Sequence, residues 1–410
     1  MDTGYLIVSV YHDNVAEPIS EAAVTVRGDN YEQSFTTDSN GKTPKIALPA
    51  PLKIYSLTPQ TEVRPYSVYQ VEVVKPGYET TIINGVQVLP DETSLQNVFL
   101  SKISPLLKSA PINVIDIPDN SLWGGTGGNT SNTNNPLETD VRVFPQILIP
   151  EYVIVHGGSP TNTNVANYYV PFTDYIKNVA SGEIYSTWPT EAIKANIYAI
   201  LSFTMSRIYS EWYLSQGYKF TITSLPQYDQ SYVHNRTIFQ KISDVVDEIF
   251  EYHIQIPGRN YPFFAQYNDG IKVNNPGWLS QWGSKYLADQ GYNALQILRY
   301  YYVDNLTLNS ASEIEGLPLS FPGYNLELNA CSEAVQKVQI MLNTISGSYP
   351  AIPKINPADG RYQNSTVQSV EMFQQVFRLP ITGIVDFNTW YNISYIYIAV
   401  SKMLQGVVRN

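Results

Sequence analysis

A low-complexity segment divides this chain of 410 residues. Residues 124–136 read GGTGGNTSNTNNP and contain no large apolar side chain. Gly, Ser, Thr and Asn bury too little surface to offset the entropy lost on ordering, so such a segment behaves as a flexible linker and an accessible proteolytic site. The chain therefore cannot form one uninterrupted domain, and its length favours about two to four domains.

In residues 1–103, apolar residues recur at every second position in several short runs, which is the pattern of β-strands. Apolar and polar residues alternate from Tyr66 to Val74, which is typical of a strand with one buried face. The pair Asn84–Gly85 lies between two short apolar runs and predicts a two-residue hairpin turn. Together with the turn signal DSNG at residues 38–41 and KPGY at residues 75–78, this pattern resembles a small transthyretin-like or carboxypeptidase-regulatory-like sandwich. We expect an all-β sandwich over residues 1–103, then a pro-segment and flexible linker over residues 104–148.

The charge balance limits the classes of partner. The formal net charge is −11 and the sequence pI is about 4.9, which argues against nucleic acid and anionic membrane surfaces as main partners. No apolar run is long enough to span a membrane, and the N-terminus lacks the basic region and apolar core of a signal peptide. We expect no nucleic-acid partner, no membrane insertion, and synthesis without a recognisable signal peptide.

Cysteine and histidine give no sign of a metal site. The single cysteine, Cys331, excludes an intramolecular disulfide framework. The four histidines show no metal-ligand spacing. We expect no metal and no other cofactor.

Glu183 is the candidate catalytic residue. A short helix that starts near Asp174 and a long amphipathic helix with Pro189 in its first turn place Glu183 at the connection between them. Tyr185 and Trp188 follow closely, and such apolar surroundings raise the pKa of a carboxyl group because desolvation disfavours the charged form. A raised pKa suits a general acid near neutral pH. The alternative is a helix-terminal charge favoured by the helix dipole.

Two segments in this central part resemble the signatures of the SpoIID-like lytic transglycosylases. The first is Gly182-Glu-Ile184 with residues 188–195, and the second is GWLSQWG at residues 277–283 with residues 291–302 behind it. The resemblance implies an α+β SpoIID-like catalytic domain over residues 149–323, with Glu183 as its acid/base residue. It also implies that the second signature lines the groove opposite Glu183. The candidate substrate-binding residues are Ser280, Gln281, Trp282, Tyr267, Trp188 and Glu191.

Residues 324–410 have the apolar spacing of three helices. Tyr362, Phe373 and Trp390, among others, resemble the hydrophobic frame of the three-helix peptidoglycan-binding domain. Three positions depart from that family: Gln363, Thr382 and Asp386 stand where it usually has Gly, Asp and Gly.

The order of these parts resembles the SleC-type spore cortex-lytic enzymes. That resemblance implies a zymogen, which a germination protease activates by cutting within residues 124–148. It implies spore cortex peptidoglycan as the substrate. It further implies synthesis in the mother cell and a location in the cortex or coat region of the spore.

The number of carboxylates separates the possible reactions. A conventional glycoside hydrolase needs two, and Glu191 is the candidate for the second, although a first-turn helix charge explains it as well. A lytic transglycosylase needs one, because the 6-hydroxyl of the sugar attacks its own anomeric carbon and forms an anhydro product. The single Glu183 favours this reaction.

Two other readings stay open. Some SpoIID-like members carry a cysteine pair before Ser-Gln-Trp-Gly with a proposed zinc, and residues 267–277 of this chain have no cysteine. One alternative is therefore a non-catalytic peptidoglycan-binding spore or wall protein with a degenerate SpoIID-like domain. Another is a muramidase or amidase, which the masses of the products would distinguish from a transglycosylase.

Overall fold

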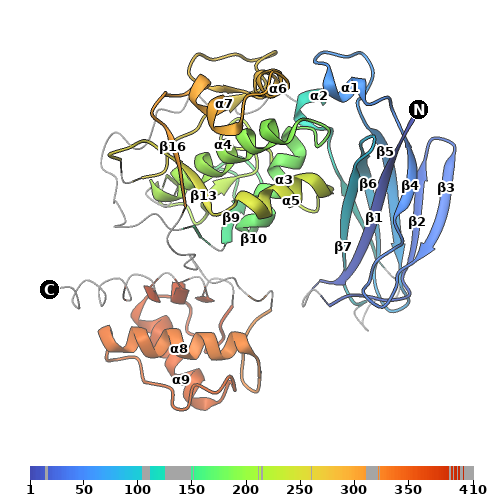
Figure 1. The fold of residues 1–410 in the computed structure, drawn as a ribbon. Helices are drawn as coiled ribbons and strands as arrows, with labels where there is room; N and C mark the ends of the chain where they lie inside the picture. The colour runs from blue at the N-terminus through green and yellow to red at the C-terminus, as the bar shows by residue number, and fades with distance from the viewer. Residues whose placement is uncertain are drawn as a thin grey trace. The chain divides into compact units, whose positions relative to one another are not determined.

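The computed structural model describes residues 1–13, 17–103, 111–124, 149–150, 152–210, 212–213, 216–259, 261–310, 322, 324–386, 389–390, 392–394, 396–397 and 400. The chain forms two compact units, coloured along the sequence in Figure 1. The first comprises residues 1–149 and 153–314, and the second comprises residues 150–152 and 315–410. Almost all of the Gly/Asn-rich linker and of the expected cleavage window lies outside the described residues.

The N-terminal region is β-rich and consists of two sheets. One sheet has the order β7 (Thr93–Leu100), β1 (Asp2–His12), β4 (Ile46–Ala50), in which β1 runs parallel to β7 and antiparallel to β4. The other has the order β3 (Tyr31–Thr36), β2 (Ala23–Gly28), β5 (Ser67–Val74), β6 (Thr80–Val88), β8 (Ile112–Asp116). Valines and leucines of both sheets form a buried core of their own. The predicted alternation is present in β5, where Tyr69, Val71 and Val73 are buried.

The hairpin predicted at Asn84–Gly85 is wrong. Both residues lie inside the continuous strand β6, which pairs with β5 on both sides of them with a shift of register between Tyr69 and Val71. Gly85 has a φ of 84°, so the pair forms an irregularity in a strand rather than a turn. The Asn84 side chain accepts a hydrogen bond from Gln70 and donates one to Asp116, which fixes it between neighbouring strands.

Part of the segment expected as pro-segment and linker has regular structure. Strand β8 pairs in parallel with β6, and the short helix α2 (Ser121–Gly124) follows it. Residues 111–124 are therefore part of the first compact unit.

The central region is joined to the sandwich by hydrogen bonds. Strand β12 (Ile238–Phe239) pairs antiparallel with β7 and adds an edge to the first sheet. Beside it, the Gln96 side chain accepts a hydrogen bond from Thr237 and donates one to the carbonyl of Asn235. The main core of the first unit also includes Tyr66 and Leu122 from the N-terminal region.

Helix α4 (Thr190–Tyr209) is the centre of the central region. It contacts α3 (Phe172–Glu183), α5 (Gln240–Ile249), α6 (Gln281–Asp289) and α7 (Ala294–Tyr301). The sequence predicts an amphipathic helix here, but α4 is buried on nearly every face because other helices surround it. The remaining strands are short: β9 (Tyr152–His156), β10 (Asn167–Pro171), β11 (Ile222–Thr223), β13 (Tyr252–Gln255), β14 (Tyr267–Asn268), β15 (Leu279–Ser280) and β16 (Thr307–Ser310).

The second unit is helical. Helices α8 (Glu333–Ser348) and α9 (Asn364–Val376) pack around a core that includes Leu342, Phe373 and Trp390. A further helical turn includes Thr389 and Trp390. Of the described helices in either unit, none combines the length and the apolar composition needed to cross a membrane.

Candidate active site

Glu183 is the last residue of α3 and its side chain is fully buried. Its Oε1 accepts a hydrogen bond of 2.8 Å from the backbone N–H of Ser231, while Oε2 has no hydrogen-bond partner among the described residues. Burial raises the pKa of Glu183 to about 7, against the opposing effects of the Ser231 N–H, the Tyr267 hydroxyl and the charge of Arg236. A carboxyl group in this state can both give and take a proton near neutral pH.

A buried ionic network holds the loop that presents the Ser231 N–H. The carboxylate of Asp229 accepts hydrogen bonds from Arg207 at 2.9 Å and from Tyr213 at 2.6 Å, and both residues of the Asp229–Arg207 ion pair are inaccessible to solvent. The next residue, Gln230, is fixed by hydrogen bonds to Tyr175 of α3 and to α4. The position of the Ser231 N–H relative to Oε1 of Glu183 therefore depends on Asp229, Arg207 and Gln230, which no sequence pattern indicates.

Several buried polar side chains of the first unit have atoms without a hydrogen-bond partner among the described residues. Both polar atoms of the Gln281 side chain and all three guanidinium nitrogens of Arg236 have no hydrogen-bond partner among the described residues. The Tyr267 hydroxyl lies near Glu183 and Gln230 but forms no hydrogen bond of good geometry with a described residue. Tyr267 acts on the Glu183 carboxyl from β14, and the parallel pairing of β14 with β15 brings Gln281 to the end of the neighbouring strand. Such groups are costly to leave unpaired, so their concentration here is typical of a site that binds a polar ligand.

Trp188 and Trp282, two of the predicted site residues, lie together with Tyr185, which the sequence places in the apolar surroundings of Glu183. Trp188 and Trp282 have ring centroids 4.9 Å apart, and Tyr185 meets both at their edges, at 5.9 and 6.1 Å. All three are buried. Flat apolar faces with polar edges are suited to sugar rings, and they also form ordinary core packing.

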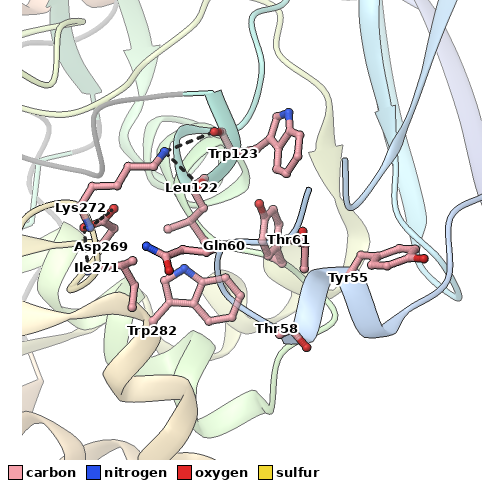
Figure 2. A pocket seen from close by; sticks show the side chains of 11 residues that line it. Tyr55, Thr58, Gln60, Thr61, Leu122, Trp123, Asp269, Ile271, Lys272 and Trp282 are labelled. Carbon is pink, nitrogen blue, oxygen red and sulfur yellow. Dashed lines mark hydrogen bonds between the residues drawn. The ribbon is translucent and has the colours of Figure 1, made fainter. Parts of the chain in front are cut away.

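A cavity of about 260 Å³ borders this aromatic group. Tyr185 and Trp282 line it from the central region, and Gln60, Thr61 and Trp123 line it from the N-terminal region. Figure 2 shows the Trp282 ring on the cavity wall and Lys272 reaching across to the carbonyls of residues 122 and 123. Glu183 itself does not line this cavity.

The N-terminal region covers the connection between α3 and α4. We call α1 (Ile54–Leu57) and residues 117–124 the N-terminal cover. The Asn120 side chain donates to the carbonyls of Ser181 and Ile184, at 3.3 and 3.4 Å, on the two sides of Glu183. Trp188 donates through Nε1 to the carbonyl of Ser56 at 2.9 Å. The cover thus contacts the residues that flank Glu183 directly.

The other predicted site residues have structural contacts. Ser280 caps α6, where its hydroxyl accepts from the backbone N–H of Gly283 at 2.9 Å. Glu191 lies in the first turn of α4 and accepts a hydrogen bond of 2.7 Å from the N–H of Ala294 at the start of α7. Glu191 is absent from the groups that shift the pKa of Glu183.

The described residues contain no group of three or more His, Cys, Asp or Glu side chains arranged to hold a metal ion. His156, for example, is hydrogen-bonded at Nδ1 to Asn167 and at Nε2 to the carbonyl of Ser159. Cys331 is an exposed free cysteine.

Sequence reasoning did not find Tyr175, Ser231 or Arg236. Ser231 acts through its backbone N–H, which no side-chain motif can mark. Arg236 lies in the irregular stretch 224–237, where no period of 2 or 3.6 indicates which side chains are buried.

The comparison with protein families gives one match, to the family described as "Putative peptidoglycan binding domain", over residues 331–393. The predicted C-terminal peptidoglycan-binding domain is thereby confirmed, and it indicates association with the cell wall. Two of the three departures from the family pattern have hydrogen-bond partners in this fold: the Thr382 N–H donates to Gln374 at 2.9 Å, and the Asp386 carboxylate accepts from the N–H of Thr389 at 2.8 Å. A comparison with curated proteins gives no match.

Solved structures show only remote likeness. The Bacillus anthracis TIE protein is 14% identical over 42% of this chain and 26% of its own, with a TM-score of 0.19. A 3-chlorocatechol 1,2-dioxygenase from Rhodococcus opacus (12% identity, 25% of this chain, 61% of its own) and a catechol 1,2-dioxygenase from Acinetobacter radioresistens (17%, 27%, 58%) both have TM-scores of 0.18. The chain spans less than two thirds of each of these proteins. TM-scores this low do not indicate a shared fold.

Proposed function

We propose that this protein is a lytic transglycosylase that cleaves the glycan strands of spore cortex peptidoglycan, with Glu183 as its single acid/base residue. The observation that carries the proposal is the state of Glu183. It is a buried carboxyl group whose pKa is raised to about 7, and the groups that shift this pKa include no second carboxylate.

Two proton transfers at one carboxyl group make up the reaction. Protonated Glu183 gives its proton to the glycosidic oxygen as the bond to the anomeric carbon breaks. The resulting carboxylate then takes the proton of the sugar 6-hydroxyl while that oxygen bonds to the anomeric carbon. Glu183 returns to its starting state, and the product ends in an anhydro sugar without the addition of water. The unpaired Oε2 is the atom available for both transfers, because Oε1 is occupied by Ser231.

The N-terminal cover supports the zymogen part of the proposal. In the uncut chain Glu183 has no solvent exposure, and Asn120 and Ser56 bind its flanking residues. A glycan strand needs access to Glu183, so the cover must move. We propose that proteolysis within residues 124–148 permits this movement, and that the peptidoglycan-binding domain at residues 331–393 holds the enzyme on its substrate.

Complete burial of Glu183 also favours a second candidate, a non-catalytic peptidoglycan-binding protein in which the central region only supports the wall-binding domain. Buried carboxyl groups without a partner on one oxygen are unfavourable in a purely structural role, which weighs against this candidate.

Mass spectrometry of fragments released from spore cortex tests the proposal. We expect protein cut between residues 125 and 148 to release anhydro-ended fragments, and Glu183→Gln to release none while it still binds cortex. The exposed carboxylate variant Glu251→Gln is the matched control and keeps activity. If the released fragments have ordinary reducing ends, and both Glu183→Gln and Glu191→Gln release none, the protein is a hydrolase that uses two carboxylates. If the cut, uncut and variant proteins all bind cortex but release no fragments, the non-catalytic candidate is supported. If the cut and uncut proteins are equally active, the protein is not a zymogen.

A further inference from the structure

Arg236 is a buried cation without a partner. Its side chain is 4% exposed, and none of its three guanidinium nitrogens has a hydrogen-bond partner in the part of the chain that the structure describes. It also forms no ion pair with a described carboxylate. Removing a charge from water is strongly unfavourable unless other groups compensate it. The position of Arg236 therefore requires an explanation.

The guanidinium lies against the backbone next to Glu183. A Cβ atom at Gly182 would lie 2.9 Å from Cζ and 3.0 Å from Nε of Arg236. Only glycine leaves this room, because any side chain at that position would displace the guanidinium. The glycine of the Gly-Glu-Ile segment thus provides the space in which Arg236 sits.

The loop that carries Arg236 is anchored on the same helix as Glu183. The Asn178 side chain of α3 donates to the carbonyl of Val233 at 2.7 Å and accepts from its N–H at 3.1 Å. The N–H of Arg236 in turn donates to that same carbonyl at 3.1 Å. The backbone of the loop that carries Arg236 is consequently tied to α3, the helix that ends at Glu183.

The titratable groups around this pair come from three parts of the unit. Tyr175 of α3 and Tyr267 of β14 face Glu183, and Tyr66 and Asp119 of the N-terminal region face Arg236. Burial lowers the pKa of Arg236 to about 10, so the guanidinium stays charged at neutral pH. Its charge opposes the effect of burial on Glu183.

We propose that Arg236 is a positioning residue for Glu183, whose guanidinium stabilises the carboxylate that Glu183 becomes between its two proton transfers. The inference rests on the proposed function for the identity of the reaction. In the uncut chain the Asp119 carboxylate competes for the same charge. Asp119 belongs to the N-terminal cover and also faces Arg64 at 3.5 Å and Tyr66 at 2.9 Å, so movement of the cover removes its carboxylate from Arg236.

A direct titration of Glu183 tests the pairing without any need for catalysis. Protein labelled with ¹³C at glutamate carboxyl carbons is titrated by NMR, and the Glu183 resonance is the one missing from Glu183→Gln. We expect Arg236→Gln to raise the titration midpoint of Glu183, because the variant removes the positive charge that opposes the effect of burial on this carboxyl group. Arg236→Lys keeps a charge and shifts the midpoint less. Arg259→Gln, at a half-buried position that does not act on Glu183, leaves the midpoint unchanged. An unchanged midpoint in Arg236→Gln overturns the inference.

A second variant keeps the inference testable should Arg236→Gln fail to fold. Gly182→Ala retains the arginine but forces its guanidinium to shift, because a Cβ would lie 2.9 Å from Cζ. The variant therefore also changes the midpoint, and an unchanged midpoint in a folded Gly182→Ala overturns the inference. In the cut protein, cleavage stops at pH values above the titration midpoint of Glu183, because the acid must be protonated to donate a proton. This upper pH limit rises in a variant that raises the midpoint. A raised midpoint in protein that never cleaves cortex supports the pairing and refutes only the proposed function.

Discussion

At the scale of single residues, the protonation of Glu183 couples the site to stability. The pKa of Glu183 is about 7 in the folded chain, against an ordinary value of 4.5. The folded state therefore binds a proton more tightly than the unfolded state. This contribution to the free energy of unfolding is fully present below pH 4.5 and is lost as the pH rises through 7. The difference corresponds to roughly 3 kcal/mol.

The variant Glu183→Gln removes this pH dependence, because its amide stays neutral. We expect the free energy of unfolding of the wild type to fall by roughly 3 kcal/mol relative to the variant between pH 5 and pH 8, as measured by urea denaturation. Groups common to both proteins cancel in this comparison. The free energy of unfolding of the control variant Glu251→Gln has the same pH dependence as that of the wild type. Parallel pH profiles of Glu183→Gln and the wild type would contradict the raised pKa.

The sequence indicated the candidate acid but not the groups that act on it. Tyr185 and Trp188 follow Glu183 closely enough to predict an apolar environment, and all three are buried. Ser231 and Arg236 reach Glu183 from a loop far along the chain, and their positions depend on the Asp229–Arg207 pair and on Asn178. Local patterns describe contacts within a helix or strand, whereas this site is assembled by contacts between distant segments.

At the scale of elements, Gly85 shows why the hairpin prediction failed. An Asn-Gly pair favours positive φ angles, and positive φ angles occur both in hairpin turns and in irregular strands such as those with a β-bulge. The pair alone therefore does not distinguish the two. What decides between them is β8, which pairs with β6 as far as Asn84. The residue after β8, Ile117, donates its N–H to the carbonyl of Asn84 at 2.9 Å, and its own carbonyl occupies the place where a Cβ of residue 85 would stand. The sequence around residues 84–85 contains no information about β8.

Two glycine variants separate the two costs at this element. Gly77 has a φ of 87° and open space around it, so Gly77→Ala loses only about 1 kcal/mol of stability, for the left-handed backbone. Gly85→Ala has the same backbone cost and also collides with Ile117, which adds about 2 kcal/mol. Thermal and urea unfolding of both variants measure the difference. Equal losses would mean that β8 does not pack against Gly85.

At the scale of the whole molecule, the first unit combines regions that the sequence separates. Residues 1–103 and 149–323 differ in period and are divided by the linker, yet Tyr66 and Leu122 join the core of the central region and β12 joins the sandwich. Pairing between strands so far apart leaves no local signature. The C-terminal domain is different, because its helices pack on one another and its motif identifies it in the sequence.

This shared core predicts how the cut protein behaves. A cut between residues 125 and 148 leaves the N-terminal cover held by noncovalent contacts alone. Before the cut, the linker keeps the cover at an effective concentration on the order of millimolar, and afterwards its occupancy depends on the concentration of the fragment. We therefore expect the two fragments to elute together at high protein concentration in size-exclusion chromatography. We also expect the cleavage activity per molecule to rise on dilution, whereas the uncut protein stays inactive at every concentration.

Two additions make the dilution experiment decisive. Excess N-terminal fragment, purified from the cut protein, should suppress the activity again, because it restores the contacts of Asn120 and Ser56 with the residues around Glu183. Cut protein carrying Asn120→Ala should become active at a higher concentration than the unmodified cut protein, since the cover has lost its hydrogen bonds to Ser181 and Ile184. Activity that is independent of concentration and unaffected by added fragment would show that the cover does not restrain Glu183. Burial of Glu183 would then have to be relieved by the glycan itself.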